Sequence, residues 1–284
     1  MKTANLGPLR RVGVWLQGAA LLLGAALSGC QSPHQALQAL ASRHAVQLET
    51  LPTLPFPLTV GIPPLRPMPS RIRIYLEGDG RAWATSTQPS LDPSPRHLLV
   101  AGLAFGDPTP SLYLARPCQF VTPLDCRSAL WTDRRFSKEV LDSLDQALTL
   151  IKTRYGNQDF ELVGYSGGAA LALLLAVRRD DIALVQTLAG NLSPRQWASL
   201  HGLSPLNGSL EPLDQRQRLA QIPQRHLFGA DDRVVPPVLL QRYREAMGTG
   251  VCLQSAVLPE VSHSLGWEQV WPAWREQPLD CVRD

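Results

Sequence analysis

Residues 160–175 read Phe160-Glu-Leu-Val-Gly-Tyr-Ser-Gly-Gly-Ala-Ala-Leu-Ala-Leu-Leu-Leu175. The apolar run before Gly164 predicts a strand, and the apolar run after Gly168 predicts a buried helix. The pattern G-x-S-x-G lies between them, with Ser166 at its centre. A serine at a sharp strand-to-helix turn has strained backbone angles, and side chains at the flanking positions would collide with the neighbouring strand and helix. We therefore predict that Ser166 projects from this turn as a nucleophile.

Strands and helices alternate on both sides of this turn. Apolar and helical patterns predict strands at 71–76, 159–164, 183–189, 225–229 and 251–258, and helices at 137–155, 167–179 and about 237–247. The segment 97–105 is a buried helix or strand, and the proline-flanked segment 56–60 is expected to be an edge strand. Strands that alternate with helices predict an α/β fold whose mostly parallel central sheet has helices on both faces.

Three features, taken in chain order, resemble the α/β-hydrolase family. Ser166 occupies the turn, the stretch Leu227–Pro236 resembles the acid-bearing loop after the penultimate strand, and His263 follows the last strand. The likeness extends from about Arg71 to the end. It is similar in particular to bacterial α/β-hydrolase lipoproteins, on the stretches Glu77-Gly-Asp-Gly80, Arg116-Pro-Cys118 and Arg135-Phe-Ser137. The resemblance implies a triad of Ser166, Asp232 and His263 that acts through an acyl-enzyme.

Two neighbouring aspartates, Asp231 and Asp232, compete for the role of the acid. Counting back from Val235-Pro236, which resembles the family's D-x-x-V-P pattern, favours Asp232. Asp231 is then expected to face solvent or to cap the following turn. Among the other histidines, His226 lies at the start of a predicted strand, where a packed imidazole is the expected role.

The resemblance also implies an oxyanion hole. One donor would be the Gly167 N–H at the start of the helix. The other would come from the loop after the strand 71–76, with the Asp79 N–H as first choice and the Gly80 N–H as second. Glu77 stands where the family has a histidine, and could anchor Arg81 or the loop itself. The alternative for this loop is a glycine-rich turn that binds nothing.

Residues 190–224 occupy the place where the family inserts a cap. Their apolar side chains either line an acyl pocket or pack the connection onto the sheet. The segment is too short for a large lid, so we expect a compact, short-acyl substrate. Trp197 and Tyr165 are expected to contact it. The sequence lacks nucleotide-binding and metal-binding motifs, so we expect neither a metal nor an organic cofactor.

The N-terminal residues predict export. Basic residues precede the apolar run Val12–Leu27, and Leu27-Ser-Gly-Cys30 resembles a bacterial lipobox. We expect residues 1–29 to be a signal peptide, residues 30–53 a lipidated N-terminus and tether with the lipid on Cys30, and residues 54–284 the hydrolase domain. An ordinary signal peptide, or a short anchor that happens to end in cysteine, is the alternative. Because residue 31 is not Asp, we expect an outer-membrane lipoprotein that faces the periplasm.

Charge and cysteine content agree with this location. The full chain has 27 basic and 24 acidic residues, and without the three basic residues of the signal peptide it is neutral, which excludes a typical nucleic-acid binder. Four further cysteines are expected to form disulfides in an oxidising compartment, because a four-thiolate zinc site would need C-x-x-C spacing. The most local pairing joins Cys118 to Cys126 and Cys252 to Cys281.

These patterns favour a lipid-anchored, periplasm-facing serine hydrolase that acts on a small ester. Two other readings remain at this point. A serine peptidase or amidase would share the fold and the triad, and a non-catalytic envelope-binding lipoprotein would share the fold alone.

Overall fold

The computed structural model describes residues 1–3, 31–64 and 70–279. The chain divides into a unit of residues 1–32 and a compact unit that begins at Pro33 and contains the sheet and its helices. Most of the expected signal peptide, together with Cys30, lies outside the described residues. No helix among the described residues is long and apolar enough to cross a membrane.

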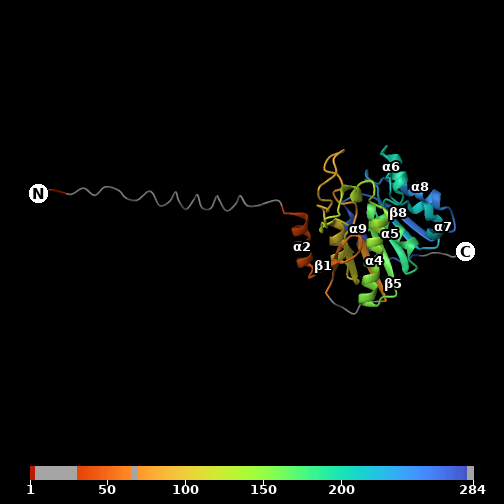
Figure 1. The fold of residues 1–284 in the computed structure, drawn as a ribbon, viewed down its shortest axis with the longest axis horizontal. Coiled ribbons are helices and arrows are strands. Elements are labelled where there is room, and N and C mark those ends of the chain that lie inside the picture. Colours follow the sequence, from red (N-terminus) through yellow and green to blue (C-terminus); the bar gives the residue numbers. More distant parts are fainter. Residues whose placement is uncertain (4–30, 65–69, 280–284) are drawn as a thin grey trace. The chain divides into compact units, whose positions relative to one another are not determined.

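The centre of the fold is an eight-stranded sheet (Figure 1). Its strands, in chain order, are β1 Gln47–Leu51, β2 Leu58–Ile62, β3 Arg71–Leu76, β4 Ser111–Leu114, β5 Asp159–Tyr165, β6 Ile182–Leu188, β7 Gln224–Gly229 and β8 Leu253–Leu258. They lie in the order β1-β2-β4-β3-β5-β6-β7-β8. The strands from β4 to β8 are parallel, whereas β2 pairs antiparallel with both β1 and β4. The expected α/β fold with a mostly parallel sheet is confirmed.

The start of the domain differs from the prediction. The expected tether 30–53 contains helix α2, Pro33–Arg43, and strand β1, which is the edge of the sheet. The strand predicted at 56–60 is present as β2, but its expected edge position is wrong, because β2 lies between β1 and β4 and all five of its residues are buried. Leu37 on α2 is fully buried in the core, so the folded unit begins at residue 33 rather than 54.

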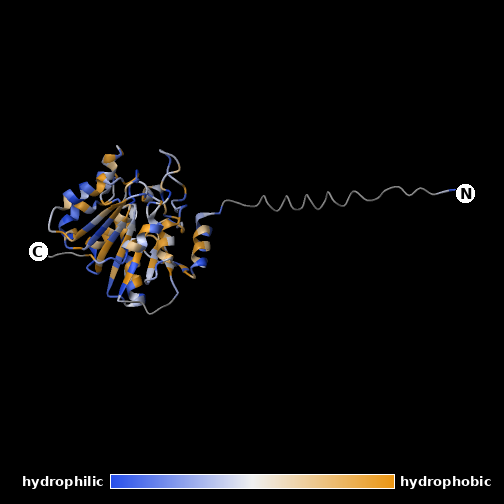
Figure 2. Cartoon of the chain, turned by 180° about the vertical axis from the view of Figure 1, so that it is seen from behind, coloured by the Kyte–Doolittle hydropathy of each residue, from blue (hydrophilic) through white to orange (hydrophobic). Residues whose placement is uncertain are grey.

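Helices cover both faces of the sheet, as the alternation predicts. They are α3 Leu99–Phe105, α4 Lys138–Tyr155, α5 Gly167–Arg178, α6 Pro194–Leu200, α7 Arg216–Leu219, α8 Val238–Met247 and α9 Trp267–Trp274, with 3-10 helices at Ser128–Trp131 and Pro212–Gln215. Helices α4, α5 and α8 contribute to one apolar core, and α2, α3 and α9 to the other. Figure 2 shows hydrophobic residues through the strands and hydrophilic residues on the outer turns. The segment 97–105 is thus a helix, and β4 and α9 are elements that the sequence patterns did not predict.

Helix α4 has the ends that its sequence predicts. The Ser137 Oγ accepts a hydrogen bond from the Val140 N–H, and Gly156 ends the helix in the left-handed conformation. One face of the helix is buried against the sheet. The cap-like segment 190–224 contains only short helices, among them α6 and α7.

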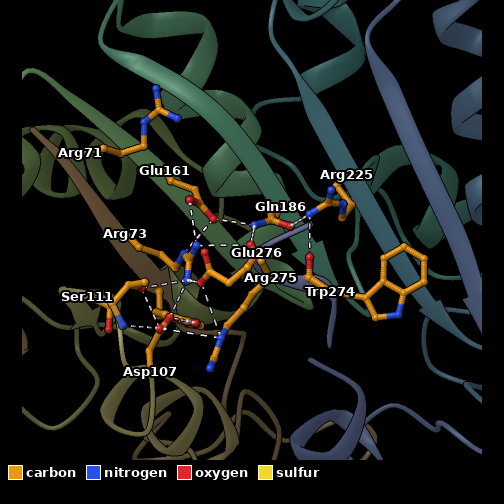
Figure 3. A network of polar contacts seen from close by, with 12 residues as sticks. Arg71, Arg73, Asp107, Ser111, Glu161, Gln186, Arg225, Trp274, Arg275 and Glu276 are labelled. Carbon is orange, nitrogen blue, oxygen red and sulfur yellow. Dashed lines mark hydrogen bonds and ion pairs between the residues drawn. The ribbon is translucent and has the colours of Figure 1, made fainter. Parts of the chain in front are cut away.

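A polar network crosses the sheet face that α9 covers (Figure 3). Arg73 on β3 donates to Glu161 on β5 at 2.8 Å and to Asp107 at 2.8 Å. Arg225 on β7 donates to Gln186 at 2.8 Å and to the Trp274 carbonyl, at the end of α9, also at 2.8 Å. Backbone carbonyls at a helix C-terminus lack partners within the helix, so these arginines fix the end of α9 to the sheet.

We predict that Arg73→Met lowers the free energy of unfolding by about 3–5 kcal/mol, because it leaves buried carboxylates without their cation. Chemical denaturation measures this change. Arg71→Met is the matched control: Arg71 lies two residues earlier on the same strand, its ion pair with Asp159 is 49% exposed on the arginine side, and we expect a loss of only about 0–1 kcal/mol. Equal losses in the two variants would contradict the structural role of the network.

Candidate active site

Ser166 lies at the turn between β5 and α5, as the sequence predicts. Its backbone has φ 51° and ψ −121°, a conformation that residues other than glycine rarely adopt and that typically costs about 1–3 kcal/mol. The turn also excludes side chains at its flanking positions. A Cβ at Gly168 would lie 2.5 Å from the Leu76 carbonyl oxygen, because α5 begins directly against the end of β3. A Cβ at Gly167 would overlap the carboxylate of Asp79.

The structure brings together the three residues of the expected triad. His263 Nε2 lies 3.1 Å from Ser166 Oγ, and His263 Nδ1 lies 2.9 Å from Asp232 Oδ2. Asp232 is 2% exposed, and its other oxygen accepts the N–H groups of Val234 and Val235 at 2.8 Å each. These amide donors satisfy the buried carboxylate and fix its orientation toward His263.

Asp231, the competing candidate, takes no part in this arrangement. Its side chain is exposed, and its backbone N–H donates to the Val261 carbonyl at 3.0 Å. The adjacent side chains therefore point in different directions, and only Asp232 contacts His263. His226, by contrast, is fully buried and bonded to Thr187 and Gln224, and burial lowers its pKa to about 3.

Two aromatic residues hold the loop that carries His263. The Tyr165 hydroxyl donates to the His263 carbonyl oxygen at 2.9 Å, and the Trp267 Nε1–H donates to the same oxygen at 3.0 Å. Trp267 opens α9 and is fully buried, so the histidine loop is tied to the helix that the polar network anchors. Tyr165, expected to contact substrate, lines the pocket and also positions this loop.

The loop after β3 lies beside Ser166. A Cβ at Gly78 would be 3.3 Å from the Cβ of Ser166. The Gly78 N–H is already used, because it donates to Glu77 Oε1 at 2.9 Å. Among the described residues, the amides of Asp79, Gly80 and Gly167 donate to no protein acceptor, so none of the expected oxyanion donors is already used.

Of the two roles expected for Glu77, the structure shows that it anchors the loop after β3 and does not pair with Arg81. Its second carboxylate oxygen accepts the Tyr113 hydroxyl at 2.9 Å, and the side chain is 2% exposed. Burial raises the pKa of Glu77 to about 7, although the Gly78 amide, the Tyr113 hydroxyl and the charge of Arg116 act in the opposite direction. Burial thus disfavours the charged form of Glu77, whose carboxyl group lies near the expected oxyanion site.

Two buried arginines, which the sequence analysis did not assign to the site, hold the side chain of Asp79. Arg116 forms an ion pair with one carboxylate oxygen, and Arg135 donates to the other at 2.6 Å. Burial opposes the charge of Asp79, but Arg135 and Arg116 outweigh it and lower the pKa of this carboxyl below its ordinary value. Both arginines belong to short stretches that carried the family resemblance. That resemblance was the one sequence signal that could have assigned them to the site.

A pocket of about 540 Å³ opens at Ser166. Its volume is within the range of about 300–1,000 Å³ that is usual for small-molecule sites. The apolar part of its wall includes Trp83, Trp197 and Val235. Trp197 comes from α6, where its Nε1–H donates to the Val234 carbonyl at 2.8 Å. Trp197, which was expected to contact substrate, therefore lines the pocket at Ser166, and the cap-like segment forms part of the wall of that pocket.

One of the expected disulfides is present in the described part of the chain. Cys118 and Cys126 are bonded, which closes a short loop next to Arg116. Cys252 is also disulfide-bonded. Cys281, its expected partner, lies outside the described residues, so that pairing stays a prediction.

No protein-family model and no curated protein sequence matches the chain. Solved structures do match. An alpha-beta serine hydrolase homologue from Coxiella burnetii has a TM-score of 0.54 at 15% identity, over 81% of this chain and 94% of that one. A putative dienelactone hydrolase from Klebsiella pneumoniae has 0.56 at 17%, over 81% and 95%. An esterase from Pyrococcus furiosus has 0.57 at 12%, over 86% and 91%. At these identities the likeness establishes the fold.

We predict that Asp232→Asn lowers kcat on an activated ester by roughly 10³- to 10⁴-fold, because the amide favours the wrong imidazole tautomer, as in serine proteases. Asp231→Asn is the matched control and should cost about tenfold or less. Steady-state kinetics on one ester measure both, after thermal melts have established that each variant folds. A larger loss in Asp231→Asn would move the acid by one residue.

We also predict a pH-dependent stability effect at Glu77. The unfolded carboxyl loses its proton above about pH 4.5, whereas the folded one keeps it until about pH 7. Stability should therefore fall in that window by up to about 1.4 kcal/mol per pH unit, and Glu77→Gln should remove this contribution.

Urea denaturation of both proteins between pH 4.5 and 8 measures the difference in their free energies of unfolding. The exposed Glu245→Gln serves as the control and should leave the slope unchanged. A constant difference between wild type and Glu77→Gln across this range would show that Glu77 titrates normally.

Proposed function

We propose that this chain, which has the α/β-hydrolase fold, is a serine hydrolase whose substrate is a carboxylic ester. The observation that carries the proposal is the position of His263 between Ser166 and Asp232, with hydrogen-bond distances of 3.1 and 2.9 Å. This geometry satisfies the requirement that a nucleophile lie within reach of its base, and that the base be oriented by a third group.

In the proposed reaction, His263 Nε2 accepts the proton of the Ser166 hydroxyl while Ser166 Oγ attacks the ester carbonyl carbon. Asp232 accepts a hydrogen bond from the Nδ1–H and stabilises the imidazolium. The amides of Gly167 and of Asp79 or Gly80 bind the oxyanion. His263 then protonates the leaving alkoxide, and water, activated by the same histidine, hydrolyses the acyl-enzyme and releases the acid.

A compact acyl group fits the pocket best. The cap-like segment 190–224 supplies only short helices, and Trp197 from α6 lines the pocket with the other aromatic residues of its wall. Hydrolysis of amides by the same residues is the other outcome that a substrate panel would reveal, since an amine leaving group makes a greater demand on His263 as the acid.

We further propose that the protein is a lipid-anchored envelope protein that faces the periplasm. The support is the stretch Leu27-Ser-Gly-Cys30 after an apolar run, together with cysteines that form disulfides.

We predict that a fluorophosphonate probe labels the protein and that Ser166→Ala abolishes both labelling and hydrolysis of 4-nitrophenyl esters. Activity should decrease as the acyl chain lengthens, because the cap-like segment contains only short helices and no large lid to cover a long chain. Ser199→Ala, an exposed serine on α6, is the control and should retain labelling. A folded wild-type protein that neither reacts with the probe nor hydrolyses any ester would favour a binding role, and a preference for long-chain esters would contradict the compact substrate.

For the anchor, we predict that Cys30→Ser releases the protein from the membrane fraction or blocks its processing, because the lipid would be attached to that sulfur. Cell fractionation and the mobility of the protein on a gel measure this. An unchanged size and unchanged membrane association would count against lipidation.

A further inference from the structure

The pocket at Ser166 has an unbalanced charge. Three arginines, Arg81, Arg96 and Arg135, line it, whereas its carboxylates are Glu77 and Asp79. Both carboxylates already accept hydrogen bonds from other groups of the protein.

In the buried part of the wall, two arginines share one carboxylate. Asp79 is shared between Arg116 and Arg135, whose side chains are 5% and 7% exposed. One carboxylate thus faces two guanidinium groups. Glu77 forms no ion pair with them: its oxygens accept the Gly78 amide and the Tyr113 hydroxyl, and because burial raises its pKa to about 7 it balances the arginines only in part near neutral pH.

The mouth of the pocket adds two more cations. Neither Arg81 nor Arg96 forms an ion pair with any of the residues that the structure describes. Arg81 is half-buried and Arg96 is exposed, so both can bind a charged group without the large desolvation cost of a buried ion. Guanidinium groups present several N–H donors in a plane that matches the two oxygens of a carboxylate.

The loop that carries these arginines is held by backbone hydrogen bonds. The Arg81 N–H donates to the Pro93 carbonyl at 3.0 Å, and the Ser90 N–H donates to the Ala82 carbonyl at 3.0 Å. The Trp131 indole donates to the Ser90 carbonyl at 3.2 Å. Because these contacts fix the loop from within and from the 3-10 helix at Ser128–Trp131, the two guanidinium groups are attached to an ordered wall.

Asn191 provides a second observation that points to a polar ligand. It lines the same pocket, is 4% exposed, and its Oδ1 accepts no hydrogen bond from the described residues. Its backbone N–H donates to the Ser166 carbonyl at 2.9 Å, so its position beside the nucleophile is fixed. Buried polar groups normally have a partner, so this unpaired amide oxygen adds a polar group to the wall beside the nucleophile.

We propose that the ester substrate carries a free carboxylate, which Arg81 and Arg96 bind at the mouth of the pocket while its ester group lies at Ser166. This inference rests on the serine hydrolase function proposed above and adds the charge of the substrate. It makes Arg81 and Arg96 specificity-determining residues, and leaves the bond-breaking steps to the triad.

Matched pairs of esters test the proposal. The first pair, 4-nitrophenyl hydrogen adipate and 4-nitrophenyl hexanoate, differs by a carboxylate on the acyl side. The second pair, 4-acetoxybenzoate and its methyl ester, differs by a carboxylate on the leaving group. We expect wild-type kcat/KM at low salt to favour the anionic member of at least one pair by about tenfold or more, and added salt to reduce that preference because the arginines are accessible to ions.

Arg81→Gln and Arg96→Gln should each lower the anionic-to-neutral ratio of kcat/KM by about tenfold, mainly through KM, since each removes a charged hydrogen-bond donor. Arg216→Gln, an exposed arginine outside the pocket, should leave the ratio unchanged. Hydrolysis of both pairs by wild type without preference for the anion would overturn this inference and leave the serine hydrolase intact. Failure to hydrolyse any of the four esters or to react with fluorophosphonate would overturn both.

Discussion

The close approach of α5 to the end of β3 is the constraint on which the rest of the site depends. The helix can begin there only because Gly168 has no side chain, since a Cβ would lie 2.5 Å from the Leu76 carbonyl oxygen. The chain must therefore turn sharply at Ser166, and its φ of 51° is the consequence. The same approach brings the loop after β3 against the serine, so that one contact places both the nucleophile at the pocket and the unpaired amides beside it.

The other two members of the triad are held by separate parts of the fold. Asp232 is fixed locally, through the amides of its own turn. His263 depends on distant contacts, because its carbonyl accepts hydrogen bonds from Tyr165 and from Trp267 at the start of α9. The far end of that helix is bound by Arg225, on the sheet face that α9 covers (Figure 3). The polar network has no residue in the pocket, yet through α9 it contributes to the position of His263. Loss of these contacts would therefore be expected to shift His263 by displacing α9.

Local patterns were sufficient for much of this fold and for the turn at Ser166, whereas Asp232 and His263 were assigned through the resemblance to the α/β-hydrolase family. Strand β4, four residues long, and helix α9, which contains Pro272, lacked a pattern strong enough to predict them. Helix α2 and strand β1 lie in the segment 30–53, which was expected to be a tether that runs into a first helix or strand. The ion pairs of Asp79 with Arg116 and Arg135 join residues 37 and 56 positions apart, and such contacts have no periodicity that a single sequence could reveal.

The proposed mechanism requires that Ser166 form a covalent bond with its substrate, and detection of the acyl-enzyme tests this most directly. Wild-type protein mixed with excess 4-nitrophenyl acetate and quenched in acid within the first turnovers can be digested and its peptides examined by mass spectrometry. We predict one acetyl group, located on the peptide that contains Ser166 and absent from Ser166→Ala. Acetylation of another residue at comparable occupancy, or active protein with no acetyl group on Ser166 at any quench time, would contradict it.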